Sequence, residues 1–95
     1  CLGTWLTRTF DAWDAWDAPA ASWEQRLNQE VVELASAIAA HPQEVVVVTN
    51  EVGWGLVSEY PAGRVFADQL GRLNQAIAAA CDQVVLLVAG RPLHL

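Results

Sequence analysis

The sequence of 95 residues has no methionine, two cysteines and only five Lys or Arg residues against 11 Asp or Glu. Its net charge of −6 excludes a protein that grips a nucleic-acid backbone by counterion release. The same charge disfavours an anionic membrane surface. Small anions are not excluded, because backbone N–H groups bind them without charged side chains. We therefore expect no nucleic-acid partner.

The two cysteines, Cys1 and Cys81, are far apart and fit no CxxC spacing. Small disulfide-stabilised domains are rich in cysteine, so we expect two buried or partly buried free thiols and a reducing, cytoplasmic setting. No apolar run reaches about 18 residues, which predicts no membrane span, and no signal peptide is recognisable. Patterned sequence begins directly at Cys1, which suggests a fragment or a processed piece of a longer protein.

What is present is typical of one small globular domain, with 54% apolar and 17% charged residues. Three segments have the apolar spacing of helices: 1–16, which Pro19 should end, 23–40 and 62–80. Ser22 and Gln25 have the spacing of a capping box at the start of the second. His41 should be its C-terminal residue rather than a catalytic base. Tryptophans in the D-A-W repeat, Trp13 and Trp16, should be packing or interface anchors.

Two runs without polar alternation, Val45–Val48 and Val84–Ala89, predict strands covered on both faces. The expected order is helix, helix, strand, helix, strand, with parallel strands joined by a right-handed crossover. Gly90 and Pro92 should end the second strand. An isolated pair of such strands is a poor sheet. The fold class is therefore α/β, and we expect residues 1–95 to be the C-terminal part of a larger domain.

Ligands of open α/β sheets bind beyond the carboxyl ends of the strands. Four residues follow the first predicted strand at such an end: Thr49, Asn50, Glu51 and Gly53. Glu51 is suited to Mg²⁺ or to the hydroxyl of a ribose or an alcohol, while Gly53 and Gly55 allow positive φ and close approach of a ligand. Equally, Thr49 and Asn50 can simply close the strand end, with Glu51 solvated.

The third predicted helix carries Arg64, Asp68 and Arg72 at successive spacings of four. This row is either a set of exposed ion pairs or a clamp that orders the 53–63 loop. In the second case Arg64, held by Asp68, binds Glu59 or a phosphate. The sequence contains no GxxxxGK[ST], GxGxxG, HExxH or GxSxG motif. It has no complete catalytic constellation, and we assign no metal ligands.

Three motifs together resemble the C-terminal half of the bifunctional adenosylcobinamide kinase/adenosylcobinamide-phosphate guanylyltransferase family. They are V-V-V-V-T-N-E-V-G-W-G-L-V (45–57), R-x-F-x-D-x-x-G-R-L-N-Q-x-I-A (64–78) and C-D-Q-V-V-L-L-V-A-G-R-P-L (81–93). C-L-G-T-W-L-T (1–7) is similar to the segment after the family's second nucleotide-binding strand. Segment 8–40 is the least similar. Departures from the family pattern include Gly3, Thr4, Arg8, Ser58 and Arg91.

The resemblance implies a RecA-like P-loop fold, homotrimers, and GTP, ATP and Mg²⁺ as substrates and cofactor. It implies phosphorylation of adenosylcobinamide and transfer of GMP from GTP, through a guanylylated histidine, to adenosylcobinamide phosphate. The family's P-loop and that histidine lie upstream of the position of Cys1, and neither His41 nor His94 matches the histidine. Two alternatives remain: a non-catalytic module that completes a partner's sheet, and another RecA-like P-loop enzyme.

Overall fold

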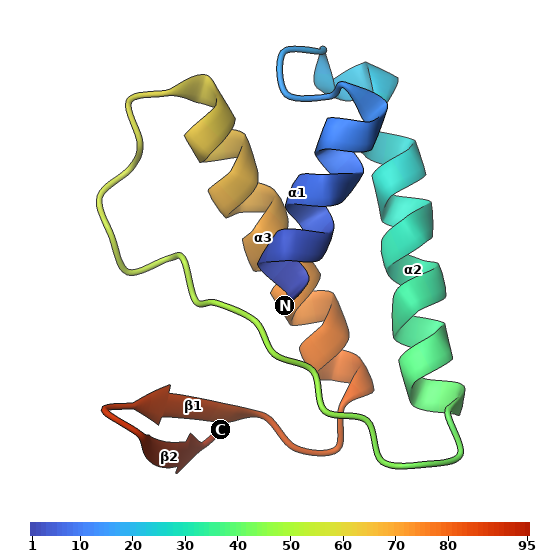
Figure 1. Ribbon diagram of the computed structural model, residues 1–95, viewed down its shortest axis with the longest axis vertical. Helices are drawn as coiled ribbons and strands as arrows, with labels where there is room; N and C mark the ends of the chain where they lie inside the picture. The colour runs from blue at the N-terminus through green and yellow to red at the C-terminus, as the bar shows by residue number, and fades with distance from the viewer.

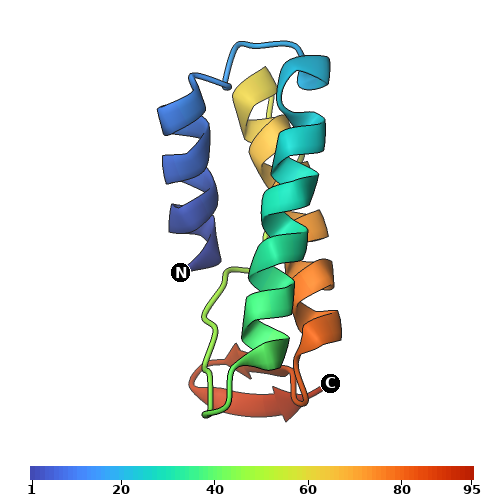
Figure 2. The ribbon, with the colours of Figure 1, turned by 90° about the vertical axis from the view of Figure 1, so that its right-hand side faces the viewer.

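A computed structural model describes residues 1–95, with a helical body and a small β-hairpin. Helices α2 and α3 lie side by side, α1 packs against α3 as a separate layer, and the hairpin lies at the C-terminal end of α3 (Figures 1 and 2). The elements are α1 (Leu2–Trp13), the 3₁₀ turn η1 (Ala20–Ser22), α2 (Glu24–Ala40), α3 (Pro61–Ala80), β1 (Val85–Val88) and β2 (Arg91–His94).

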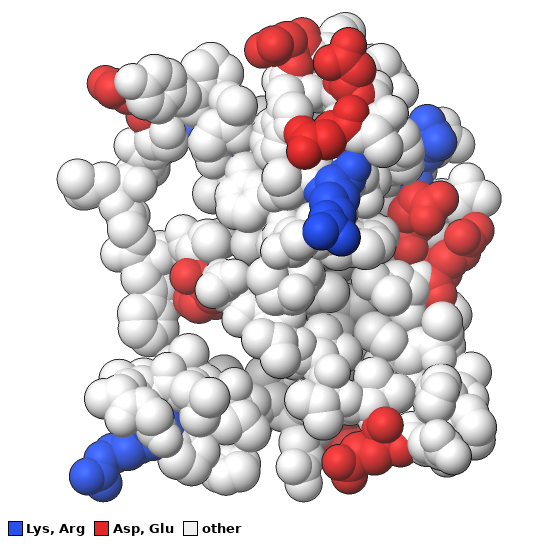
Figure 3. All heavy atoms as spheres, viewed as in Figure 1, with Lys and Arg blue, Asp and Glu red and all other residues white.

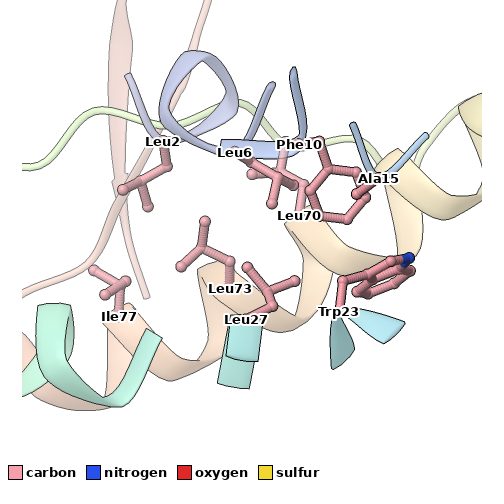
Figure 4. Packing of buried hydrophobic residues seen from close by; sticks show 9 residues of the cluster. All are labelled: Leu2, Leu6, Phe10, Ala15, Trp23, Leu27, Leu70, Leu73 and Ile77. Atoms are coloured by element: carbon pink, nitrogen blue, oxygen red, sulfur yellow. The ribbon is translucent and has the colours of Figure 1, made fainter. Parts of the chain in front are cut away.

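The core lies between the three helices and consists of nine buried apolar residues (Figure 4): Leu2, Leu6, Phe10, Ala15, Trp23, Leu27, Leu70, Leu73 and Ile77. The ring of Phe10 is fully buried, with centroids 5.0 Å from Trp16 and 4.8 Å from Trp23. Arg26 stacks over Trp13 at 4.1 Å, a cation–π contact. The interpretation of Trp13 and Trp16 as packing anchors is therefore confirmed within this chain.

The helices predicted over 23–40 and 62–80 are confirmed, and His41 is the C-terminal cap of α2. The first helix is shorter than predicted: it ends at Trp13 because Asp14 adopts a left-handed conformation with φ of 50°. The capping box was wrong. Ser22 lies in η1, where its hydroxyl donates to the carbonyl of Pro19 (2.7 Å), so Trp23 is the N-cap and no side-chain hydrogen bond caps α2.

The prediction of two parallel strands is not met in this chain. β1 pairs antiparallel with β2, and the turn between them places Ala89 and Gly90 at φ of 52° and 75°. Two positive φ values in a two-residue loop suit the twist of a hairpin, so β1 ends in a turn at Ala89 and Gly90, as predicted for Gly90, and the chain returns as β2. Pro92 is tolerated in β2 because a two-stranded sheet has only edge strands.

Val45–Val48 is not a strand here, because no neighbouring strand pairs with it. Its backbone is anchored at one point, where the N–H of Leu2 donates to the carbonyl of Val48 (2.9 Å). Val46 and Val48 are 78% and 64% exposed, whereas Val47 packs against the core. Burial on both faces, predicted for both apolar runs, is therefore not found for Val45–Val48, nor for β1.

The molecule exposes more surface than its mass predicts. Its accessible area is 7079 Å², against about 5,400 Å² for a folded monomer of this mass. Its radius of gyration is 14.2 Å, against about 12 Å for a compact domain of this length. Apolar side chains on the 45–60 segment and the hairpin contribute much of the excess, and the left part of the face in Figure 3 is mostly uncharged.

Both cysteines are free, as predicted, although Cys1 is exposed and only Cys81 is partly buried. None of the helices combines the length and the apolar character required to cross a membrane.

Candidate functional site

The candidate site is the segment Thr49–Gly53, part of the connection that passes beside the N-terminus of α1 on its way from α2 to α3 (Figure 1). Its position beside α1 is fixed by the bond from the N–H of Leu2 to the carbonyl of Val48. The thiol of Cys1 lies 3.6 Å from Oδ1 of Asn50 and 3.5 Å from the hydroxyl of Thr4. Asn50 is thus the predicted site residue that meets the start of α1.

Thr49 and Asn50 are also fixed from the other side, by Asn74 of α3. Nδ2 of Asn74 donates to the backbone carbonyl of Asn50 (2.9 Å), and Oδ1 of Asn74 accepts from the hydroxyl of Thr49. These contacts join two of the predicted site residues to α3. Asn74 lies 25 residues after Thr49 and 24 residues after Asn50 in the sequence. The spacing of residues in the sequence could not predict this role of Asn74, because spacing does not show which side chains an irregular segment meets.

Glu51 is exposed, and its Oε1 accepts a hydrogen bond from the backbone N–H of Gly53 (2.9 Å). One carboxylate oxygen therefore shapes the loop, while the other is free to accept from a ligand. Neither Gly53 nor Gly55 adopts the positive φ that glycine allows, since Gly90 is the glycine with positive φ. In this chain the two glycines do not need the left-handed region.

A shallow groove of about 400 Å³ lies beside Asn50. It runs along the exposed face of α1 and offers hydroxyl, amide, guanidinium and carboxylate groups next to one aromatic ring. Its lining residues are Cys1, Gly3, Thr4, Thr7, Arg8, Asp11, Asn50 and Phe66. Such a mixture suits a small polar or anionic ligand. The residues that line it do not include a nucleophile hydrogen-bonded to a base.

The loop that follows the candidate site is held against the first turn of α3. Nη1 of Arg64 donates to the backbone carbonyls of Ser58 and Glu59, both at 3.0 Å. Arg64 therefore meets the predicted loop, although it binds main-chain oxygens rather than the carboxylate of Glu59. The hydroxyl of Ser58 also accepts from the N–H of Tyr60 (3.1 Å).

Asp68 takes no part in that contact. Its carboxylate pairs with Arg72 (3.5 Å), and Arg72 also approaches Glu24 of α2 at 4.0 Å. Of the two pairs that the spacing of four permits, only the one with Arg72 forms, so the expected support of Arg64 by Asp68 is not found. All three side chains are about half exposed or more, as in ordinary surface ion pairs.

A metal site made of several side chains is not present in this chain. No group of three or more His, Cys, Asp or Glu residues is placed to hold a metal ion. Glu51 brings a single carboxylate, and one of its oxygens is engaged by Gly53. The residues present therefore do not fit the ion that the resemblance implies, and we derive no step through it.

Three helices packed on one another, beside an irregular segment that carries polar groups and a small two-stranded sheet, place the chain among α/β proteins. The family model described as cobinamide kinase/cobinamide phosphate guanyltransferase matches residues 1–95. The chain belongs to this family.

Curated relatives agree with the family match. The chain is 47% identical over 77 residues to the bifunctional adenosylcobalamin biosynthesis protein CobU of Escherichia coli, covering 81% of this chain and 41% of that protein. It is 44% identical over 77 residues to CobU of Salmonella typhimurium, with the same coverage. It is 36% identical over 95 residues to CobP of Pseudomonas aeruginosa, covering 100% of this chain and 50% of that one. The chain thus spans about half the length of these relatives.

Proposed function

We propose that residues 1–95 form the C-terminal part of an α/β P-loop domain that phosphorylates adenosylcobinamide and transfers GMP to the product. The observation that carries this proposal is the family match along all 95 residues. In the kinase step, the hydroxyl of the aminopropanol arm forms a bond to the terminal phosphorus of a nucleoside triphosphate, and a nucleoside diphosphate leaves. In the second step, GMP passes from GTP to the phosphate, and pyrophosphate leaves.

The exposed apolar segments support the domain proposal. Val46 and Val48 on one segment, and Leu87 and Val88 on β1, are each more than half exposed. In the complete domain, 45–48 would become a strand of a parallel sheet, where neighbouring strands cover its edges and helices its faces. The exposed Trp54 and apolar residues on helix faces, such as Val32 of α2, are available for contacts in a homotrimer of the complete protein. We also propose a cytoplasmic location for the complete protein, because the sequence has few cysteines.

Within that domain, we assign Thr49, Asn50, Glu51 and Gly53 to the pocket for nucleotide or adenosylcobinamide. Their support is the groove beside Asn50 and the free oxygen of Glu51. Arg64 acts as a positioning residue for the loop that follows. The groups that react lie outside this chain, so its residues bind and orient rather than carry out the phosphoryl or nucleotidyl transfer.

The test is an assay of the full-length protein with adenosylcobinamide, ATP or GTP, and Mg²⁺, followed by mass spectrometry of the corrinoid. We expect adenosylcobinamide phosphate first and adenosylcobinamide-GDP when GTP is supplied. Binding of neither nucleotide and no corrinoid product would overturn the proposal and favour a non-catalytic assembly module. Hydrolysis of nucleotide with no modified corrinoid would favour another P-loop enzyme.

Two substitutions of Glu51 test the pocket assignment. Glu51→Gln keeps an oxygen that accepts from the N–H of Gly53 but removes the charge, whereas Glu51→Ala removes both. If the carboxylate binds a ligand, both variants should weaken nucleotide or cobinamide affinity. A Glu51→Gln variant with wild-type affinity and turnover would show that Glu51 only shapes its loop.

A further inference from the structure

We infer that Asn74 is a positioning residue for the candidate pocket, an inference that rests on the function proposed above. Its amide makes two hydrogen bonds to consecutive residues, one to the hydroxyl of Thr49 and one to the carbonyl of Asn50. Both polar atoms of the Asn74 side chain are thus used, and both partners belong to the proposed pocket. Asn74 itself does not line the groove beside Asn50.

The location of the contact explains why it matters. The 41–60 connection contains no helix or strand, so neither helical nor sheet hydrogen bonds fix Thr49 and Asn50. On the α1 side, the backbone is anchored at Val48, before the pocket segment begins, and Asn50 itself hydrogen-bonds only to the thiol of Cys1, a weak donor. Asn74 therefore supplies the stronger polar contacts that define where the Asn50 backbone lies, and with it the amide that borders the groove.

The chemistry of the amide is specific. Asn74 donates to a carbonyl and accepts from a hydroxyl at the same time. It therefore uses both the donor and the acceptor of its side-chain amide. Aspartate keeps the acceptor for Thr49 but places a carboxylate oxygen against the Asn50 carbonyl. Alanine removes both contacts. Because each change moves the pocket segment without removing a group that faces the groove, we expect altered ligand binding at retained fold.

The experiment uses the full-length enzyme and compares Asn74→Ala, Asn74→Asp and Thr49→Val. The matched control is Gln75→Ala, which changes the adjacent, exposed residue of α3, whose side chain makes no hydrogen bond. We expect kcat/KM to fall about tenfold in Asn74→Ala and Asn74→Asp, which corresponds to the loss of one or two hydrogen bonds. Gln75→Ala should stay near wild type.

A double variant separates positioning from general stability. If Asn74 and Thr49 act through their shared bond, the losses in Asn74→Ala and Thr49→Val should not add in the double variant. Thr49→Ser, which keeps the hydroxyl, should retain most of the activity. Thr49→Val removes one exposed hydroxyl, so it reports on the contact even if changes at Asn74 prevent folding.

The outcomes distinguish this inference from the function on which it rests. A full-length protein that makes neither product refutes the proposed function. A wild type that is active while Asn74→Ala and Thr49→Val match Gln75→Ala refutes the positioning role alone. A lower melting temperature with unchanged kcat and KM also refutes it, because Asn74 would then serve only the fold.

Discussion

The side chain of Ser58 lies directly on Gly63 in the first turn of α3, so that a Cβ atom on this glycine would stand 2.5 Å from the Ser58 Oγ and 2.8 Å from its Cβ. Contacts this short force the loop backbone to move, since the serine Cβ is attached to it. Gly63 thus allows the loop after the candidate site to dock on α3, next to the two carbonyls that Arg64 holds.

The substitution Gly63→Ala should destabilise the full-length protein by about 1–2 kcal/mol, because overpacking outweighs the helix propensity that alanine adds. Chemical denaturation measures this loss. Gly71→Ala is the matched control in the same helix, where a Cβ meets nothing within 4 Å, and it should stabilise by about 0.5–1 kcal/mol. Ser58→Gly should restore stability in the Gly63→Ala background. Equal effects at both glycines would contradict the docking contact.

Replacing Arg64 by lysine should weaken substrate binding in the intact enzyme several-fold. One guanidinium nitrogen bridges the carbonyls of Ser58 and Glu59, and a lysine ammonium lacks the rigid planar fork that fixes this geometry. Steady-state kinetics should show the effect in KM, in kcat through mispositioning, or in both, while the pH dependence of the rate keeps its shape. Arg72→Lys, which changes only the exposed ion pairs with Asp68 and Glu24, is the control. Equal, small effects of both substitutions would remove Arg64 from loop positioning.

Asp68→Asn should change unfolding free energy by no more than about 0.5 kcal/mol, since it breaks an exposed helical ion pair with Arg72. Because Asp68 contacts neither the loop nor the groove, the enzyme should keep its affinity and its pH–rate profile. Loss of one limb of that profile at unchanged affinity would identify an acid–base group instead.

The helices were predictable because their burial pattern is local. Phe66, Leu70, Leu73 and Ile77 recur at steps of four, three and four, and the last three are at most 3% exposed. The same periodicity did not reveal the end of α1, which depends on the left-handed conformation of Asp14. It also did not reveal that Ser22 lies in η1. There its hydroxyl donates to the carbonyl of Pro19 and does not cap α2.

Strands and site contacts depend on residues distant in the sequence. Val45–Val48 has the composition of a buried strand, but composition does not show which strand would pair with it. In this chain β1 pairs with β2, and Val45–Val48 has no partner strand. The strand end at which Thr49, Asn50 and Glu51 were expected is not found in this chain, and their role as site residues remains a prediction. Asn74 and Gly63 were not assigned because their partners are known only once the 41–60 connection is placed in space.

The exposed apolar surface leads to a last prediction: residues 1–95 produced alone should associate or be poorly stable. Their accessible area exceeds that of a folded monomer of equal mass by about 1,700 Å², an excess comparable to what a stable protein interface buries. The hairpin also has two open strand edges, which favour pairing with other chains. Analytical ultracentrifugation and denaturation of the isolated segment measure both properties.

A pair of charge substitutions locates the surface responsible. Leu87→Glu places a charge on β1 at a side chain that is 67% exposed, and it should shift the segment toward monomer. Val32→Glu alters a valine of α2 that is similarly exposed (64%), and it should leave association unchanged, because Val32 lies on α2, outside the hairpin and the 45–60 segment. A monodisperse wild-type monomer that unfolds cooperatively with more than about 5 kcal/mol would show that the apolar hairpin needs no cover, and would count against a domain completed by further strands.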